Sequence, residues 1–490
     1  MVNLLLVSVI ISVPYSITPL NPHPKLLLIS MDGFRYDLIT PEYVPNIHQW
    51  ATEGTWFTSG SRVQYVSFTA TNHMGIVTGL HAESHGIVSN VFYEHDHGSN
   101  TFKQFDYWNI SGTAVDIKQS HEHSWYRGEP VWVTNEKAHP SRHSACLQWP
   151  MCDANFRNAN KPTYYTTWTK PQKYDEWITD IDTIIKLFTR INDPVNFIAW
   201  YIDEPDTTLH KHGFHDGKLL ITLAELDKVF SSLLDEMKRR DLIDKVNIIL
   251  TADHGHAEIE SAKTVLCVPD YVDMARIKWG QNMIYTGDEA VAREVYHNLT
   301  RAKQQTGLKV KIYTKASFPG HHHYKRIPSR IGEVILEPEI GYEVDFKCTQ
   351  EEFDRKYDHG RIKYNKSTHG HDPSNPELHA ILVLSGPDIG DAHKAGRAAH
   401  ITDLYPLMCY LLNVQPAPNN GSLHRIAMNF HLKNYSYEYF NAMYIVALPL
   451  FVIIALVILC FIVRCMMYQK ASQKTENEYV IEEDYSSSPV

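Results

Sequence analysis

Short apolar runs that end abruptly in charged residues recur along the chain. Four of them have a continuous apolar body: residues 25–34 (KLLLISMDGF), 196–206 (NFIAWYIDEPD), 246–256 (VNIILTADHGH) and 378–389 (LHAILVLSGPDI). Such runs are typical of strands buried on both faces of a parallel sheet. Between them lie helical patterns, such as residues 217–240, with apolar residues at three- and four-residue spacing. This alternation predicts a doubly wound α/β domain.

Three of these predicted strands end in carboxylates. Their acidic residues are Asp32, Asp203, Glu204, Asp206 and Asp253. Ligands of a doubly wound sheet bind beyond the carboxyl ends of its strands. Carboxylates gathered at that edge would repel each other unless cations lay among them. The pattern therefore predicts a metal site.

Two apolar segments bracket this domain. Residues 4–13 fit the apolar core of a secretory signal, with a buried first strand as the alternative. Residues 443–463 carry no charge and suffice to cross a bilayer, and Pro449 can be accommodated there. Arg464, Lys470 and Lys474 follow, so the positive-inside rule places the short tail in the cytoplasm. We expect a single-pass type I protein of the cell membrane, with its catalytic domain extracellular.

The expected domain boundaries follow from these segments. We predict a signal peptide at residues 1–18, an ectodomain at 24–430, a juxtamembrane stalk at 431–442, a transmembrane helix at 443–463 and a cytoplasmic tail at 464–490. A hydrophobic content of 43% indicates a sizeable core. The formal net charge of -10 argues against a nucleic-acid polymer as partner, because no basic surplus can neutralise a phosphate backbone.

Cysteines and glycosylation motifs agree with an extracellular domain. The cysteines on the expected outer side are Cys146, Cys152, Cys267, Cys348 and Cys409. An oxidising compartment permits disulfides, and Cys146 and Cys152 are the pair closest in sequence. Because the number of cysteines on the outer side is odd, at least one thiol is free or paired between chains. The Asn-x-Ser/Thr acceptors for N-glycosylation are Asn109, Asn298, Asn365, Asn420 and Asn434.

Pairs of carboxylate and histidine residues lie near the acidic strand ends. A helical start after Pro205 would bring Asp206 and His210 onto one face, and His254 directly follows Asp253. A third group, at residues 369–372, reads His-Gly-His-Asp. Carboxylate oxygen with imidazole nitrogen suits zinc, whereas calcium would require more oxygens. The sequence therefore suggests two metals, each held by three protein side chains.

In residues 65–79 (YVSFTATNHMGIVTG), three hydroxyl side chains, those of Ser67, Thr69 and Thr71, come just before or next to an Asn-His pair. Taken alone, the stretch is typical of a polar loop that caps a helix. The alternative is that one hydroxyl is a nucleophile. A threonine hydroxyl attacks phosphorus at neutral pH only when a metal lowers its pKa.

Five motifs in order carry a family resemblance: SMDGFR, TATNHMGIVTGLHAESHGIVSN, YIDEPDTTLH, TADHGH and STHGHD. With EPVWVTNE (residues 129–136) and QPAPNNGSLH (415–424), they resemble the ectonucleotide pyrophosphatase/phosphodiesterase family over roughly residues 25–430. The resemblance implies an alkaline-phosphatase-like α/β fold with two zinc ions at the carboxyl edge of its sheet. With its C-terminal apolar segment and without further modules, the sequence resembles the short, single-pass family members of the fourth and fifth types.

The resemblance also implies which residues of this sequence form the site, because they stand at the positions of the family's site residues. One of two Zn²⁺ per chain would be held by Asp206, His210 and His369, and the other by Asp32, Asp253, His254 and Thr69. Thr69 would be the nucleophile that forms a covalent nucleotidyl-threonine, and Asn72 would donate a hydrogen bond to the phosphate. Ser67 and Thr71 fall at positions without a catalytic role in the family.

The implied activity is hydrolysis of phosphodiester or pyrophosphate bonds in extracellular nucleotides and dinucleotides, such as ADP, ATP, NAD and diadenosine polyphosphates, to nucleoside monophosphates. A choline-phosphodiester or lysophospholipid hydrolase is a second interpretation, because other family members use the same metal core on lipids. A weakly active adhesion or recognition protein is a third. Retention of every implied ligand argues against the third. The sequence does not rank the nucleotides or indicate an oligomeric state.

Several positions depart from the family pattern. Ala70 and Thr71 stand where the family often has a base-stacking aromatic followed by proline, and Leu209 replaces a glycine before His210. Tyr201 matches an aromatic near the acidic strand end, and Trp168 is either a second base-stacking residue or an ordinary core aromatic. The GHHHYKR stretch (residues 320–326) is interpreted as structural. His256 and His371, which neighbour implied ligands, are interpreted as lining of the pocket.

Overall fold

The computed structural model describes residues 20–107, 120–156, 160–348, 365–390, 392–435 and 448–470. The predicted signal peptide, Asn109 and the tail from residue 471 onward lie outside the described residues. The chain divides into one unit that ends at Leu432 and a second that begins at Lys433.

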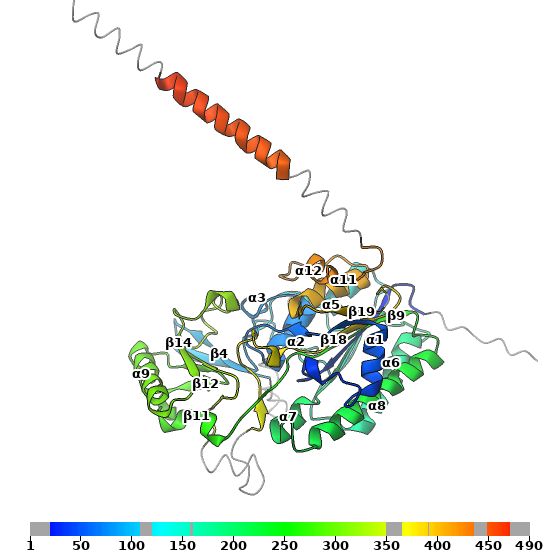
Figure 1. The fold of residues 1–490 in the computed structure, drawn as a ribbon, viewed down its shortest axis with the longest axis horizontal. Helices are drawn as coiled ribbons and strands as arrows, with labels where there is room; N and C mark the ends of the chain where they lie inside the picture. The colour runs from blue at the N-terminus through cyan, green and yellow to red at the C-terminus, as the bar shows by residue number, and fades with distance from the viewer. Residues whose placement is uncertain are drawn as a thin grey trace, which may run out of the picture. The chain divides into compact units, whose positions relative to one another are not determined.

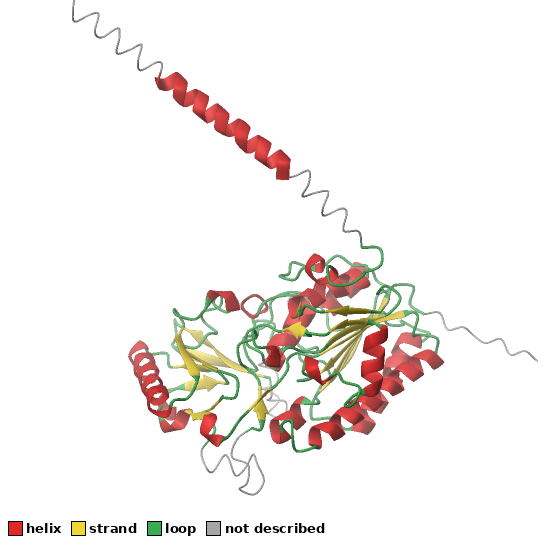
Figure 2. Cartoon of the chain, in the orientation of Figure 1, coloured by secondary structure: helices red, strands yellow, loops and turns green. Residues whose placement is uncertain are grey.

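An eight-stranded sheet organises the first unit (Figures 1 and 2). Its spatial order is β19 (His393–Ala395), β2 (Thr55–Phe57), β18 (Leu382–Ser385), β9 (Val246–Thr251), β1 (Lys25–Met31), β8 (Phe197–Ile202), β6 (Ser144–Leu147) and β7 (Tyr164–Thr166). The strands from β9 to β7 are all parallel. Every residue of β1, β8 and β9 is buried, as their continuous apolar runs predicted.

One predicted strand runs in the opposite direction from its neighbour. β18 lies in the sheet as expected, but it pairs antiparallel with β9 and β2, so the sheet is mixed. An apolar run indicates that a strand is buried on both faces and carries no information about its direction. The prediction of a parallel sheet was therefore wrong for this strand.

Helices cover both faces of the sheet (Figure 2). One layer contains α1 (Pro45–Glu53), α6 (Tyr174–Thr189) and α8 (Lys218–Arg239); the other contains α2 (Thr69–Thr78), α5 (Val131–Ala138) and α11 (Leu404–Leu411). Asp227 on α8 accepts hydrogen bonds from the backbone amides at the start of α1, and Trp50 packs edge-on against Phe230. The helix predicted at residues 217–240 is confirmed as α8.

A second, smaller sheet has its own core, which the sequence patterns did not predict. Its strands are β12 (Lys278–Gly280), β13 (Met283–Tyr285), β15 (Val334–Pro338) and β14 (Val310–Thr314), and α9 (Glu289–Thr306) packs on it. Figure 1 shows these elements together, away from the main sheet. Leu299 on α9 and Leu336 on β15 are fully buried in this core.

The remaining short helices and strands belong to neither of these two sheets. They are α3 (Ala82–His85), α7 (Asp206–His212), α12 (Leu423–Ala427), β3 (Ser61–Arg62), β4 (Val91–Asp96), β5 (Thr101–Asp106), β10 (Ala257–Glu258), β11 (Val265–Cys267), β16 (Glu343–Asp345), β17 (Ser367–Thr368) and β20 (Ala399–His400). β10 pairs with β17, and this pairing brings the segment before His369 alongside the segment after His254.

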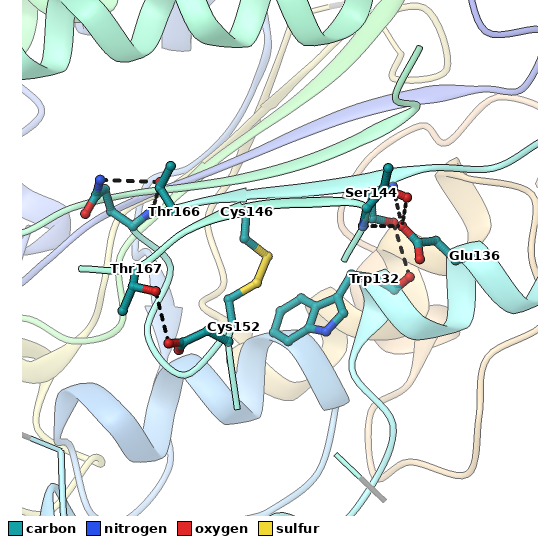
Figure 3. The surroundings of a disulfide bond; sticks show 10 residues. Trp132, Glu136, Ser144, Cys146, Cys152, Thr166 and Thr167 are labelled. Atoms are coloured by element: carbon teal, nitrogen blue, oxygen red, sulfur yellow. Dashed lines mark hydrogen bonds between the residues drawn. A yellow bond between two sulfur atoms is a disulfide. The ribbon is translucent and has the colours of Figure 1, made fainter. Parts of the chain in front are cut away.

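Two disulfides form among the described cysteines. Cys146 on β6 bonds to Cys152 in the loop that follows, as the spacing suggested (Figure 3). Cys267 bonds to Cys348, and Cys409 is a buried free thiol. Thr167, which follows β7, donates a hydrogen bond to Asp153, which follows Cys152, so the first disulfide and this contact hold the loop against the end of β7.

The second unit contains one apolar helix, Leu448–Lys470, whose side chains are exposed. By length and composition it can cross a membrane. The helix continues past the predicted boundary at residue 463, and residues 443–447 lie outside the described residues. A C-terminal apolar helix of this kind fits a membrane anchor.

Candidate active site

The order of the central strands brings the acidic strand ends together. β1 lies between β8 and β9, so Asp32, which follows β1, has the segments after both neighbours beside it. The backbone amide of Asp206 donates to the carbonyl of Asp32 at 3.0 Å, and the amide of Gly33 donates to Oδ1 of Asp253 at 3.2 Å. The predicted convergence of these carboxylates is confirmed.

Asp32, Asp253 and His254 form the first of three groups among the described residues that have the spacing of a metal site. Nε2 of His254 lies 3.2 Å from Oδ2 of Asp253 and 3.5 Å from Oδ1 of Asp32. Both of those carboxylate oxygens are buried and lack a hydrogen-bond donor among the described residues. Burial, together with the neighbouring carboxylates, raises the pKa of Asp32 well above its usual range, and burial raises that of Asp253 to about 7. A cation would remove the cost of burying these charges.

Asp206 is the centre of the second group, at the first residue of α7. Oδ1 of Asp206 lies 3.5 Å from Nε2 of His210, 3.5 Å from Nε2 of His369 and 2.6 Å from Nε2 of His256. The Nε2 atoms of His210 and His369 are 3.1 Å apart. The helical start predicted after Pro205 is therefore present, and it places Asp206 and His210 on one face.

Hydrogen bonds to carbonyl groups orient two of the histidines. Nδ1 of His254 lies 3.1 Å from the carbonyl oxygen of Gly255, and Nδ1 of His369 lies 2.7 Å from that of Ser67. A carbonyl only accepts, so Nδ1 carries the proton and Nε2 presents a lone pair to the site. Burial lowers the pKa of His254 to about 3 and that of His369 well below its usual range, which keeps both rings neutral. This donor set fits divalent metal ions.

The three hydroxyls before α2 have different surroundings. The helix begins at Thr69, and Phe68 precedes it without a side-chain cap, so the capping interpretation was wrong. Ser67 donates to the carbonyl of His371 and accepts from the amide of Gly370. Oγ1 of Thr71 is buried without a hydrogen-bond partner among the described residues. Oγ1 of Thr69 lies 3.5 Å from Nε2 of His254, which places this hydroxyl beside the first group.

Asn72 is occupied by backbone contacts. Its amide nitrogen donates to the carbonyls of Val66 and Phe68, and its oxygen accepts from the amide of Gln64. Asn90 lines the cavity beside Asp206, as Asn282 and Asn365 do, and its amide nitrogen is buried without a partner among the described residues. Sequence reasoning overlooked Asn90, although it lies inside the quoted motif that begins at Thr69. Of these two amide nitrogens, that of Asn72 is therefore engaged by the backbone and that of Asn90 lacks a partner among the described residues.

A cavity of about 580 Å³ opens beside Asp206, His210 and His369. Phe68, Trp279 and Phe346 contribute aromatic surface, and the last two rings stack at 5.0 Å with an interplanar angle of 5°. The cationic side chains in its lining are Lys211 and Lys347. A charged ligand with an apolar part fits such a lining.

Trp168 lines a second cavity, of about 150 Å³. Its ring is nearly parallel to that of Tyr107, with centroids 6.2 Å apart, and Trp149 also lines this space. Met151 and Asp153, on the loop that the Cys146–Cys152 disulfide closes, complete one wall. Trp168 is therefore part of a cavity wall rather than of the closed core.

Tyr201 contacts a candidate metal ligand. Its hydroxyl donates to Oδ2 of Asp32 at 2.5 Å, and its ring meets that of His73 edge-on at 5.1 Å. Tyr201 is buried at the end of β8 and is not one of the described residues that line the two cavities. Its contact with Asp32 indicates a role in orienting that carboxylate.

The GHHHYKR stretch lies apart from both groups. Nε2 of His322 is 3.6 Å from Oε2 of the buried Glu337, and these two residues with Asp372 form the third group that has the spacing of a metal site. Among the described glycosylation motifs, Asn420 and Asn434 are exposed and Asn298 is half-buried on α9. Asn365 instead lines the larger cavity and donates to Glu343.

A sheet edge that gathers two Asp/His groups beside a buried threonine defines a site of the alkaline-phosphatase type. The family model described as type I phosphodiesterase/nucleotide pyrophosphatase matches residues 26–372. The bis(5'-adenosyl)-triphosphatase of Xenopus laevis is 31% identical over 430 residues, which cover 84% of this chain and 85% of that protein. Human ectonucleotide pyrophosphatase/phosphodiesterase family member 5 is 28% identical over 425 residues, covering 86% and 81%.

Solved structures agree with these sequence comparisons. The structure of human ectonucleotide pyrophosphatase/phosphodiesterase 5 superposes with a TM-score of 0.70 at 27% identity, covering 83% of this chain and all of that one. The murine protein, as an inactive threonine-to-alanine variant in complex with AMP, superposes with a TM-score of 0.69 at 26% identity and the same coverage. The chain belongs to the ectonucleotide pyrophosphatase/phosphodiesterase family of the alkaline phosphatase superfamily.

Proposed function

We propose that the protein is a membrane-anchored ectoenzyme that hydrolyses phosphodiester or pyrophosphate bonds of extracellular nucleotides and dinucleotides to nucleoside monophosphates. The observation that carries the proposal is the position of the Thr69 hydroxyl beside the Asp32–Asp253–His254 group, with the Asp206 group next to it. The Xenopus relative is named as a bis(5'-adenosyl)-triphosphatase, and a murine relative holds AMP in its inactive form. These names support adenine nucleotides and dinucleotides as the substrate class.

Asp206, His210 and His369 would hold one Zn²⁺, and Asp32, Asp253, His254 and Thr69 would hold the other. Bound metal ions would lower the pKa of the Thr69 hydroxyl and neutralise charge on the phosphoryl oxygens. Tyr201 and the Gly255 carbonyl orient the Asp32 and His254 side chains toward this position. The Ser67 carbonyl does the same for His369.

Thr69 begins α2, so the positive end of the helix dipole faces an arriving phosphate. In the proposed reaction, Oγ1 of Thr69 loses its proton and bonds to phosphorus as the bond from phosphorus to the leaving oxygen breaks. Water then hydrolyses the threonine ester, which releases a nucleoside monophosphate and restores the hydroxyl. The amide of Asn90 is placed to donate to a phosphoryl oxygen during both displacements.

A nucleotide base would enter the smaller cavity and stack on the Trp168 ring. Ala70 leaves the position after the nucleophile without an aromatic ring, so base stacking would rest on Trp168 in this protein. Burial raises the pKa of Tyr107 well above its usual range, and the nearby carboxylates of Asp32 and Asp203 raise it further. This proximity connects the base cavity to the metal groups.

The function is tested with full-length protein purified in detergent and loaded with zinc. Its products from ADP, ATP, NAD, diadenosine triphosphate and a lysophospholipid are compared side by side, with and without chelator. We expect nucleoside monophosphate release that chelator removes. Choline or phosphocholine release without nucleotide hydrolysis would support the lipid interpretation, and turnover that is unaffected by Thr69→Ala would contradict the assigned nucleophile.

A further inference from the structure

The third group of possible metal ligands, His322, Glu337 and Asp372, lies outside the candidate active site. One nitrogen or oxygen atom from each residue lies within 4.8 Å of the corresponding atoms of the other two. The three residues come from distant segments, which are a short helical turn at Gly320–His322, strand β15 and the loop that follows His369. The fold therefore gathers one imidazole and two carboxylates at a further place.

Glu337 has one carboxylate oxygen that lacks a partner. Its side chain is 1% exposed, and Oε1 accepts a hydrogen bond at 2.8 Å from Nζ of Lys311 on the neighbouring strand β14. Oε2 is buried and has no hydrogen-bond donor among the described residues. A buried carboxylate oxygen is costly to leave unpaired, because it has lost its water without a replacement. A bound cation at Oε2 would remove this cost.

His322 brings a ring nitrogen to this oxygen without forming a hydrogen bond. Its Nε2 lies 3.6 Å from Oε2 of Glu337, which is beyond hydrogen-bond distance. Aromatic packing holds the ring, with its centroid 4.5 Å from that of Tyr65 and 5.3 Å from that of Phe318. Two ligand atoms of one tetrahedral zinc ion, each about 2.1 Å from the metal, lie about 3.4 Å apart. The observed separation therefore fits a shared metal ion better than a direct hydrogen bond.

Asp372 supplies the second carboxylate from a position that backbone contacts fix. Its Oδ1 accepts a hydrogen bond from the backbone amide of Ser374 at 2.9 Å, and its backbone carbonyl accepts from the amide of Asn375 at 3.1 Å. Asp372 is half-buried, so water can reach the group as a further ligand. The two carboxylates of the group face the single positive charge of Lys311, which leaves negative charge for a divalent cation to neutralise.

We propose that His322, Glu337 and Asp372 bind a structural zinc ion, an inference that does not depend on the proposed hydrolysis of nucleotides. One imidazole nitrogen, two carboxylate oxygens and a water molecule make a tetrahedral zinc site. Calcium takes about six to eight oxygen ligands and magnesium retains most of its water, so an imidazole suits neither. The bound ion would connect β15 of the second sheet to the loop after His369, and so stabilise a segment that carries a candidate catalytic ligand.

The test uses the full-length protein in detergent, stripped with chelator and reloaded with zinc. Glu337→Gln removes the negative charge but leaves an amide oxygen that can accept from Lys311, and His322→Phe keeps the packed ring but removes both nitrogens. His321→Phe is the matched control, because the neighbouring His321 is exposed and is not part of the group. We expect both site variants to retain one zinc ion fewer per chain than the wild type after gel filtration. His321→Phe should retain the wild-type number.

Equal zinc retention by the wild type and both site variants would overturn the inference. Failure of the proposed function would look different, because the wild type would then release no nucleotide while the third group still held its zinc. If the site variants do not fold, the wild-type protein decides alone. In zinc-loaded wild-type crystals, anomalous diffraction should show a peak about 2.1 Å from Nε2 of His322. A map without a peak among the three side chains would refute the site, whatever metal lies at the Asp32 and Asp206 groups.

Discussion

Oδ1 of Asn90 accepts a hydrogen bond from the backbone amide of Ala70 at 2.7 Å, and this contact fixes Asn90 beside the residue that follows Thr69. With its oxygen occupied, the asparagine presents its amide nitrogen as a donor. The cavity beside Asp206 is where that donor can act, because Asn90 lines it. The same hydrogen bond ties the start of α2 to the segment before β4.

We expect Asn90→Ala to lower kcat for a nucleotide substrate by about 10²–10³-fold, the usual effect of removing a donor to the charged transition state. Asn72→Ala is the matched variant. Since Asn72 bonds only to backbone groups, its loss should lower the free energy of unfolding by about 1–3 kcal/mol and leave kcat of the folded enzyme close to wild type. Initial rates and thermal unfolding separate the two effects. A large loss of kcat in Asn72→Ala alone would return the phosphate role to that residue.

Replacing Thr69 by Ala should abolish hydrolysis of a p-nitrophenyl nucleotide ester by at least about 10³-fold, because the nucleophile is removed. Thr71→Val serves as control: the Thr71 hydroxyl is buried without a partner among the described residues, so an isosteric apolar side chain should preserve activity and stability. Zinc content is measured in each variant. Activity lost equally in Thr71→Val would show that the segment tolerates no change, and the nucleophile would then remain unassigned.

Metal affinity should rise with pH up to neutrality. Burial raises the pKa of Asp253 to about 7 in the metal-free site, so a proton on this carboxyl group competes with the metal below that pH, and the raised pKa of Asp32 adds to the competition. Each displaced proton makes affinity rise about tenfold per pH unit until its group is ionised. His254, with its pKa lowered to about 3 by burial, adds nothing in this range. Chelator competition between pH 5.5 and 8.5 measures the slope, and a flat profile would contradict the buried, proton-sharing carboxylates.

Trp168→Ala should raise KM for adenine nucleotides by a factor of about 5–150, the equivalent of about 1–3 kcal/mol of stacking on a base. Hydrolysis of methyl p-nitrophenyl phosphate, which has no base, should change little. Tyr165→Ala is the control, because this nearby ring on β7 is 39% exposed and is not among the described residues that line the cavity. If both substrates lose activity equally in Trp168→Ala, the ring supports the fold rather than the base.

Much of the fold could be predicted because local patterns determine it. The continuous apolar bodies of β1, β8 and β9 indicated buried strands, and the spacing in α8 indicated a helix packed on them. The direction of β18 could not be predicted, since side-chain polarity is the same for parallel and antiparallel pairing. The second sheet escaped notice because its strands are only 3 to 5 residues long, too short to show a clear pattern.

For the site, the sequence by itself determined which residues can hold metal, because carboxylates and imidazoles at strand ends are required for that chemistry whatever surrounds them. It also singled out Thr69 through the order of the family motifs. Only the tertiary structure distinguished the surroundings of Asn72 and Asn90: the amide nitrogen of Asn72 donates to backbone carbonyls, whereas that of Asn90 has no partner among the described residues. It likewise brought His256 to Asp206 across 50 positions of sequence. Hydrogen bonds and approach distances of this kind arise from packing between distant segments, and packing is what local sequence patterns do not encode.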